Sequence, residues 1–244
     1  MARMFAVSEK RGSVVADDKR ISLRSWQDRI RDPSLTALLI LELCLVFLAA
    51  PLAARGLEIA RPVGETLVLA VLVIVVLLSQ RPGAIGAILL GLAATLAGLA
   101  LRPEWSPVTA SVLRRGGNIL TFSALTWVVA HSVYAPGRIT SRRLQGAAVV
   151  YLNLATIFAS AYSLLWELNP TAFTNLPTAT GGPGELAIML YFSLTTLTTT
   201  GYGDIVAVDP FACSLANLES VLGQFYLGIT VARLVTLELE HRRH

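Results

Sequence analysis

The sequence predicts an all-α integral membrane protein. Of its 244 residues, 54% are hydrophobic and only 15% are charged, a balance that favours a chain embedded mostly in a bilayer. Several apolar runs approach the roughly 20 residues that an α-helix needs to cross a hydrocarbon core of about 30 Å. No zinc-type cluster, phosphate-binding loop or hydrolase motif stands out, so an enzyme is not expected.

Hydropathy predicts six transmembrane helices. The expected spans are Leu35 to Ala54, Pro62 to Gln80, Gly83 to Leu101, Gly116 to Ala135, Gly146 to Leu168 and Phe211 to Leu234. They define an N-terminal tail (1–33), a peripheral four-helix bundle (34–136), an interfacial linker (137–145) and a final unit (146–244). In the third span, Gly83, Ala87 and Gly91 form a small-residue stripe that allows close helix contact.

A shorter apolar run lies between the fifth and sixth spans. The run from Gly184 to Thr198 covers only about 22 Å as a helix, which suits a re-entrant helix better than a crossing. The irregular backbone that follows it is tolerated at membrane depth only where it is buried in protein or lines a water-filled path. Because one chain cannot enclose such a path, we expect an oligomer.

The distribution of basic residues predicts the orientation. Outside the N-terminal tail, the basic residues expected on one side of the membrane are Arg81, Arg138, Arg142, Arg143, Arg242 and Arg243. The loops on the opposite side carry only Arg55, Arg61 and Arg102. The positive-inside rule therefore places both termini in the cytoplasm.

The basic tail favours a lipid surface as its partner. The isoelectric point is near 9.4, but no aromatic-rich basic groove accompanies the charge, so we expect contact with anionic headgroups at the cytoplasmic side and no nucleic acid. Leu23, Trp26 and Ile30 share one helical face. This face suits an amphipathic helix on the inner leaflet, with an ordinary solvated helix as the alternative.

The segment from Thr198 to Asp204 reads Thr-Thr-Thr-Gly-Tyr-Gly-Asp and joins the re-entrant helix to the last span. The pattern resembles the selectivity filter of the potassium channel superfamily, in a six-span bacterial-type subunit with a single pore loop. In a soluble protein, Gly-Tyr-Gly-Asp would be an ordinary tight turn. The flanking apolar helices favour the filter.

The resemblance implies a homotetramer in which backbone carbonyls hold potassium ions, with no other cofactor. The coordinating residues would be Thr199, Thr200, Gly201, Tyr202 and Gly203, supported by Thr198 and Asp204. Gly201 and Gly203 suit the positive φ that aiming the carbonyls at one axis requires. Thr200 stands where the family commonly has Val, a change that bears on the stiffness of the filter. In the family, Tyr202 would brace the filter against the pore helices.

The last span carries candidates for gating. Gly223 lies where related channels commonly have a hinge glycine, although glycine is also frequent in membrane helices for packing alone. Leu227, Val231 and Val235 recur at helical spacing and would form an apolar constriction that closes by dewetting.

Intramembrane polar residues need partners because charge at bilayer depth is costly. We expect Glu219 to support the filter by accepting hydrogen bonds from hydroxyls behind it, and Glu42 to pair with His131 at similar depth. A packing histidine and a pH sensor are alternatives for His131. Arg114 and Arg115 are followed by an uncharged helix, which is unlike the arginine ladder of a voltage sensor.

These features predict a potassium-selective channel that is not steeply voltage-gated, in a bacterial plasma membrane. A poorly selective cation channel is the alternative within the same class. A potassium transporter subunit is less favoured because such transporters carry four degenerate filter loops in one chain, whereas this chain has one intact loop. A membrane scaffold without conduction is the third alternative.

Overall fold

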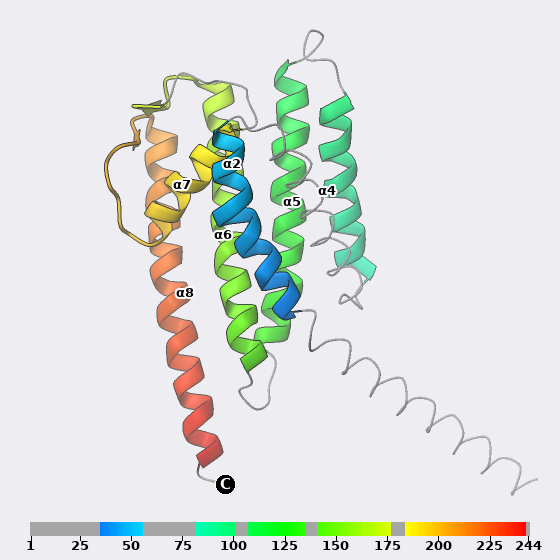
Figure 1. Cartoon of the computed structure of the whole chain (residues 1–244), viewed down its shortest axis with the longest axis vertical. Coiled ribbons are helices and arrows are strands. Elements are labelled where there is room, and N and C mark those ends of the chain that lie inside the picture. The colour runs from blue at the N-terminus through cyan, green and yellow to red at the C-terminus, as the bar shows by residue number, and fades with distance from the viewer. Residues whose placement is uncertain (1–34, 56–81, 101–106, 135–140, 177–183, 243–244) are drawn as a thin grey trace, which may run out of the picture.

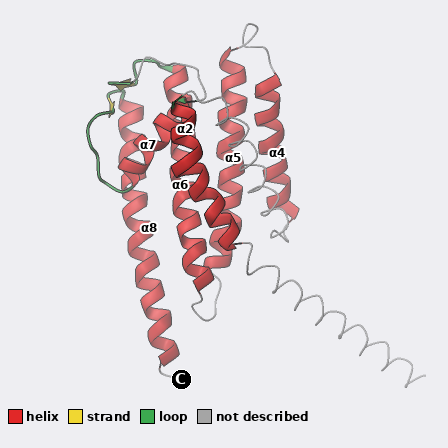
Figure 2. Cartoon of the chain, viewed as in Figure 1, coloured by secondary structure: helices red, strands yellow, loops and turns green. Residues whose placement is uncertain are grey.

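The computed structural model describes residues 35–55, 82–100, 107–134, 141–176 and 184–242, which are mostly helical (Figure 1). The elements are η1 (Leu45–Ala49), α2 (Ala50–Ala54), α4 (Pro82–Ala100), α5 (Pro107–Val133), α6 (Ser141–Leu168), β1 (Phe173–Thr174), α7 (Glu185–Leu197), β2 (Val206–Ala207) and α8 (Pro210–Arg242). Residues 35–44 are also helical and continue through η1 into α2, and we call residues 35–54 the first helix. The loop from α7 to α8 bulges away from the helices (green in Figure 2).

The helices pack in a row. α4 packs on α5, α5 on α6, α6 on α7 and α7 on α8, so that α4 and α8 lie at opposite sides of the molecule (Figure 1). The first helix crosses in front of α6 and contacts α7 through α2. The short helix α7 is therefore held among the first helix, α6 and α8.

Three described helices are long and apolar enough to cross a membrane: Leu35–Ala53, Pro82–Ala100 and Arg143–Leu168. They coincide with the expected first, third and fifth spans. The expected fourth and sixth spans are the helices α5 and α8, which are long enough to cross but do not share this degree of apolarity. The expected second span lies outside the described residues, as does the N-terminal tail.

Two helix starts differ from the sequence-based expectations. α5 begins at Pro107, well before the expected Gly116, since a proline suits the first turn of a helix, where its missing N–H is not needed. α6 begins at Ser141, so the end of the expected linker 137–145 is helical. Residues 137–140 lie outside the described part of the chain.

A π-helical turn interrupts the first helix. The turn η1 ends at Ala49, and Pro51 follows at the start of α2. Proline has no N–H to donate along the helix, and its ring crowds the carbonyl four residues earlier. The wider π turn accommodates that crowding.

The small-residue stripe of α4 is only partly a contact surface. A Cβ at Gly91 would lie 2.8 Å from the carbonyl oxygen of Gly117 in α5, so a side chain there would collide with backbone. Gly98 approaches α5 in the same way, with 2.6 Å between a Cβ and the carbonyl oxygen of Ala110. A Cβ at Gly83 meets none of the described residues within 4 Å. The expected close packing is confirmed at Gly91, whereas Gly83 makes no such contact with the described residues.

A two-residue antiparallel strand pair accompanies the helices, which the all-α expectation did not include. Phe173 in β1 pairs with Ala207 in β2, and Thr174 pairs with Val206. Next to this pair, the N–H of Val208 donates to the carbonyl of Ala172 at 2.9 Å. The loop after α6 is thereby attached to the chain that follows Asp204.

Asp209 caps the start of α8. The N–H groups of Phe211 and Ala212 donate to Asp209 Oδ1 at 2.8 and 3.3 Å, and Pro210 occupies the first turn. An aspartate followed by a proline is a favourable N-terminal pair, because the carboxylate accepts otherwise unpaired N–H groups.

The second half of α8 contacts the remainder of the chain through polar side chains. Tyr226 donates from its hydroxyl to the carbonyl of Ala147 at 2.8 Å. Tyr134, just after α5, shares a hydrogen bond of 2.8 Å with Thr230. Arg233 donates to the carbonyl of Tyr134 at 2.5 Å, and its guanidinium lies 5.2 Å from the centre of the Tyr134 ring.

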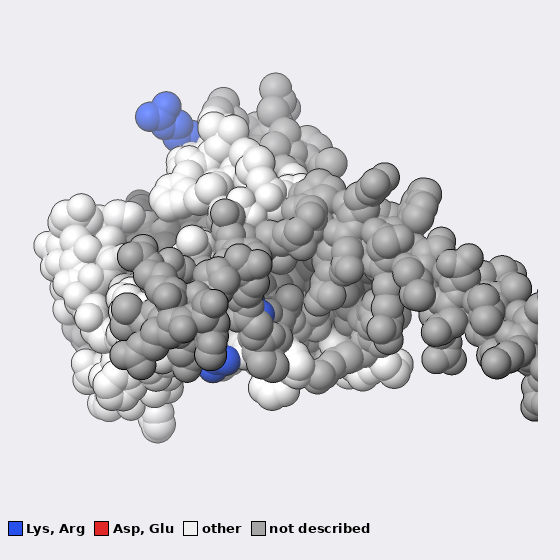
Figure 3. All heavy atoms as spheres, turned by 90° about the horizontal axis from the view of Figure 1, so that it is seen from below, with Lys and Arg blue, Asp and Glu red and all other residues white. Residues whose placement is uncertain are grey.

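The end of the molecule at which α8 terminates is seen in Figure 3. The coloured atoms in this view include separate groups of arginine atoms and no Asp or Glu atoms. Arg233, in the second half of α8, is exposed.

Candidate functional site

The candidate filter segment, residues 198–204, begins where α7 ends. The expected re-entrant helix from Gly184 to Thr198 is α7, with Gly184 and Thr198 as its two cap residues. Positive φ occurs at Gly201 (50°) and Gly203 (77°), as the sequence predicts, and also at Thr199 (57°). A β-branched residue rarely adopts this conformation, so the contacts around Thr199 must impose it.

Those contacts begin with the backbone. The N–H of Thr199 donates to the carbonyl of Thr196 at 2.9 Å, and the N–H groups of Thr200 and Gly201 donate to the carbonyl of Thr195 at 2.8 and 3.1 Å. The N–H groups thus fold back onto the last turn of α7. Within the described residues, the carbonyls of residues 199–203 accept no backbone hydrogen bond.

Threonine hydroxyls reinforce this turn. Thr198 donates to the carbonyl of Leu194 at 2.7 Å and lies 2.9 Å from the hydroxyl of Thr200. Thr195 donates to the carbonyl of Phe192 at 2.9 Å. Gln224 of α8 donates to the hydroxyl of Thr199 at 3.4 Å.

Tyr202 lies on the surface of the single chain, with 71% of its area exposed. Its ring stacks on that of Tyr191 in α7, with 6.3 Å between ring centres and 4° between ring planes. Tyr191 also donates to Asp204 Oδ2 at 2.7 Å. Tyr191 therefore holds both ends of the Tyr-Gly-Asp sequence, a role that no local sequence signal indicates.

Glu219 of α8 is fully buried behind the end of α7. Its carboxylate lies 2.6 Å from the hydroxyl of Tyr162 in α6 and contacts the hydroxyl of Ser193 in α7. Ser193 also lies 2.8 Å from the carbonyl of Ala155. The sequence predicted hydroxyl partners for Glu219, but it did not single out Tyr162, which is 57 residues away in the chain.

An aromatic cluster packs against the ring of Tyr162. The ring centre of Tyr162 lies 5.0 Å from that of Phe192 and 5.9 Å from that of Phe173, and Phe173 lies 5.5 Å from Phe192. All three pairs meet edge to face, the arrangement that aromatic quadrupoles prefer. The cluster connects α6, β1 and α7 behind the candidate filter.

Gly223 lies directly against the end of α7. A Cβ at this position would collide with the carbonyl oxygen of Leu197 and lie 3.0 Å from its Cδ1. Next to it, Ser220 donates to the carbonyl of Thr196 at 3.2 Å, and Tyr151 of α6 donates to the carbonyl of Leu197 at 3.2 Å. The packing alternative for Gly223 thus has direct structural support.

The candidate constriction lies on an uncovered face of α8. Leu227, Val231 and Val235 are 43%, 58% and 53% exposed. Other large apolar residues of α8 are exposed too, among them Phe211, Phe225 and Ile229. The described residues of one chain therefore leave these side chains largely exposed.

The expected pair of Glu42 and His131 is wrong. Glu42 is buried, and neither of its carboxylate oxygens has a hydrogen-bond partner among the described residues. His131 is exposed, because the register of α5 buries Val129 and Val133 and turns His131 to the surface. Similar depth in two antiparallel helices is therefore not sufficient, since the two side chains must also share a face.

The family model described as an ion channel matches residues 147–239. The matched region runs from α6 through α7 and the candidate filter into α8. The match covers less than half of the chain and supports a likeness of this region to potassium-type ion channels. A search of the curated proteins and one of the solved structures each found no match to this chain.

Proposed function

We propose that the chain is one subunit of a homotetrameric potassium-selective channel. The observation that carries the proposal is the backbone of residues 199–203. Positive φ at residues 199, 201 and 203 alternates with ordinary φ, and this alternation turns successive N–H groups to one side and carbonyls to the other. The carbonyls accept no backbone hydrogen bond within the described residues, which suits oxygens that bind an ion.

Permeation would be passive. A potassium ion sheds its water, is held by the oxygens of Thr199, Thr200, Gly201, Tyr202 and Gly203, and is displaced by the next ion. The C-terminal end of α7 lies beside Thr198, and four such helix ends would lower the free energy of a cation at mid-membrane. No cofactor other than potassium ions takes part.

Uncovered apolar side chains support the tetramer. Phe211 is 78% exposed, and Phe225 and Ile229 are 63% and 62% exposed. A contiguous apolar face of this kind marks a surface that other subunits or lipid cover. Within the assembly, Leu227, Val231 and Val235 would line the inner constriction.

The positive-inside rule supports the proposed orientation of the subunit. The subunit would lie in a bacterial plasma membrane with both termini in the cytoplasm, anionic lipid at that side, and the filter opening outward. Gating would be at most weakly voltage dependent, because no basic residue occurs between Asn118 and Ala130.

A poorly selective cation channel is the second candidate. It is favoured by Thr200, whose hydroxyl lies 2.9 Å from that of Thr198. A filter stiffened by apolar packing at this position would resist deformation better than one with a hydrogen-bonded polar side chain. A sodium/potassium gradient separates the two candidates, since only a selective channel has a reversal potential close to that of potassium.

The test is potassium flux through the purified protein in liposomes. The Gly203→Val variant should lose potassium flux, because a β-branched residue strongly disfavours φ of 77°. Gly228→Val is the matched control, because Gly228 lies in α8 and a Cβ there meets none of the described residues within 4 Å. Unchanged selective flux in Gly203→Val would refute the filter assignment, and absence of flux in the parent protein would favour the scaffold alternative.

A further inference from the structure

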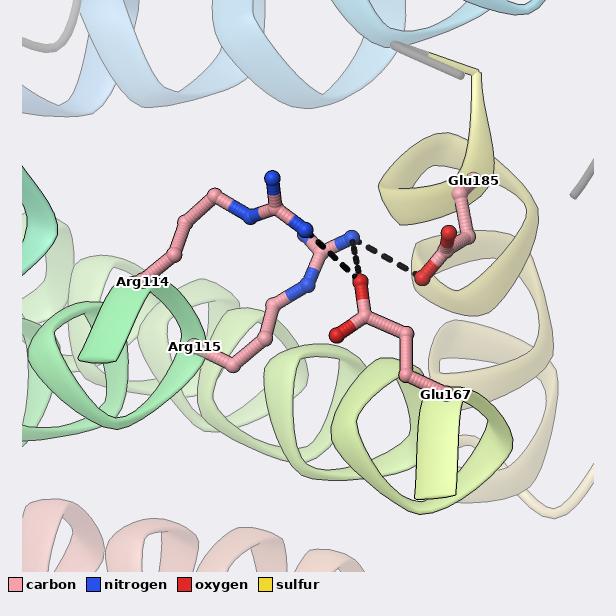
Figure 4. A network of polar contacts seen from close by, with 4 residues as sticks. All are labelled: Arg114, Arg115, Glu167 and Glu185. Atoms are coloured by element: carbon pink, nitrogen blue, oxygen red, sulfur yellow. Dashed lines mark hydrogen bonds and ion pairs between the residues drawn. The ribbon is translucent and has the colours of Figure 1, made fainter. Parts of the chain in front are cut away.

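Four charged side chains meet at the start of α7 (Figure 4). Arg114 and Arg115 extend from α5, Glu167 from the end of α6 and Glu185 from the first turn of α7. Arg114 Nη2 lies 2.8 Å from Glu167 Oε1. Arg115 Nη2 lies 3.3 Å from the same oxygen and 2.8 Å from Glu185 Oε1. Arg115 thus bridges the two carboxylates.

The bridge from Arg115 to Glu185 is the buried part of this network. Their side chains are 8% and 3% exposed, whereas that of Arg114 is 33% exposed. A buried ion pair adds little net stability compared with apolar packing, but removal of one partner leaves a costly unpaired charge. The main effect of such a pair is to fix the relative position of the groups that it joins.

Glu185 begins α7, and the candidate filter follows its end. The helix has 13 residues and is about 20 Å long, so a tilt at its first turn moves its last turn. The carboxylate of Glu185 also lies in the first turn, where the helix dipole favours negative charge. α5 and α7 make no extensive packing contact in the described chain, and the Arg115 side chain spans the space between them.

We propose that Arg115 is a positioning residue for the ion pathway. By pairing with Glu185 it fixes the start of α7, and through the rigid helix it sets the place at which residues 199–203 meet the axis. The peripheral helix α5 thereby controls the geometry of the filter without touching it. This inference rests on the proposed channel function for its effect on flux, but the positioning of α7 is measurable without flux.

Three substitutions separate this role from a general loss of charge. Arg115→Gln and Glu185→Gln each break the bridge, whereas Arg114→Gln removes the neighbouring charge and leaves the bridge intact. The charge-swapped double variant, Arg115→Glu with Glu185→Arg, restores a pair of opposite charges. If Arg115→Gln does not assemble, Glu185→Gln still tests the bridge, because both arginines then keep Glu167 as a partner.

The first readout is amide hydrogen exchange of the purified protein. Exchange in residues 188–204 should rise at least about fivefold in Arg115→Gln and Glu185→Gln, and less than about twofold in Arg114→Gln, as expected for loss of a contact that couples neighbouring groups. The charge-swapped double variant should recover most of the protection of these amides against hydrogen exchange. Equal rates of amide hydrogen exchange in residues 188–204 of all three glutamine variants would overturn the proposal.

The second readout is the potassium to sodium permeability ratio in liposomes. The permeability ratio is measured on variant protein that retains the parent's oligomeric state. It should fall at least about fivefold in Arg115→Gln and in Glu185→Gln, and it should recover in the charge-swapped double variant. A residue that only stabilises the fold would lower the amount of assembled protein without changing this ratio. If the parent protein conducts no potassium, the channel function fails, and hydrogen exchange still decides whether Arg115 positions α7.

Discussion

Substitution of Gly223 by alanine should separate close packing from backbone freedom in α8. The added methyl group would collide with the carbonyl oxygen of Leu197 and lie 3.2 Å from the carbonyl carbon. The obstacle is backbone, which cannot rotate away as a flexible side chain can. One of the two helices must therefore move, and the movement displaces the turn that precedes Thr198.

The magnitude follows from comparison with Gly228→Ala. Each variant gains up to about 1 kcal/mol from the higher helix propensity of alanine, but a Cβ at Gly228 has no neighbour within 4 Å in the part of the chain that the structure describes. Overpacking of a close contact costs about 1–3 kcal/mol, and only Gly223→Ala incurs it. For a chain of this size each kcal/mol corresponds to roughly 2–4 °C, so the two unfolding midpoints should differ by roughly 2–12 °C.

Thermal unfolding of the two purified variants, followed by tryptophan fluorescence, measures this difference, and liposome flux measures its effect on conduction. Gly223→Ala should unfold earlier and conduct less than Gly228→Ala. Equal midpoints and equal flux would refute the close contact with Leu197. Equal midpoints with reduced flux only in Gly223→Ala would instead support the hinge.

Three further predictions concern the filter surroundings and gating. Glu219→Ala should reduce open time or conductance, because the hydroxyls of Tyr162 and Ser193 lose their acceptor. Glu219→Gln should retain more function. If single-channel recordings of both variants match those of the parent, Glu219 is a packing residue only. Tyr191→Phe keeps the ring stacked on Tyr202 but removes the hydrogen bond to Asp204, a loss of about 0.5–1.5 kcal/mol that should shorten openings. A variant with parent-like open times would show that this bond does not hold the filter. A conductance–voltage curve should be shallow, and an effective gating charge of several elementary charges per tetramer would contradict that expectation.

Features that depend on neighbours in the sequence could be predicted well. The bounds of α7 follow from an apolar run between a glycine and the threonine-rich segment. Positive φ at Gly201 and Gly203 follows from residue type, because only glycine adopts it without strain. The same logic cannot predict positive φ at Thr199, which depends on hydrogen bonds to the end of α7 and on Gln224 of α8.

For contacts between residues far apart in the sequence, we could predict that a buried charged residue needs a partner, but not which residue the partner is. Burial of Glu219 requires hydrogen-bond donors, and α6 and α7 supply them. The same requirement at Glu42 suggested His131, but the helical register turns that histidine away. Arg115 shows why distance matters, because its partner Glu185 is 70 residues along the chain and no local pattern connects them.

The polar attachment of the second half of α8 sets how strongly a fourfold assembly would respond to a weak stimulus. Each hydrogen bond from Tyr226, Thr230 and Arg233 contributes about 0.5–1.5 kcal/mol, so releasing one subunit costs only a few kcal/mol. If four subunits move together, a change of about 0.7 kcal/mol in each adds to about 2.8 kcal/mol, which is roughly a hundredfold change in the equilibrium. A perturbation that changes the equilibrium of one subunit only about threefold would therefore move a fourfold assembly from a closed-to-open ratio of about 10:1 to one of about 1:10.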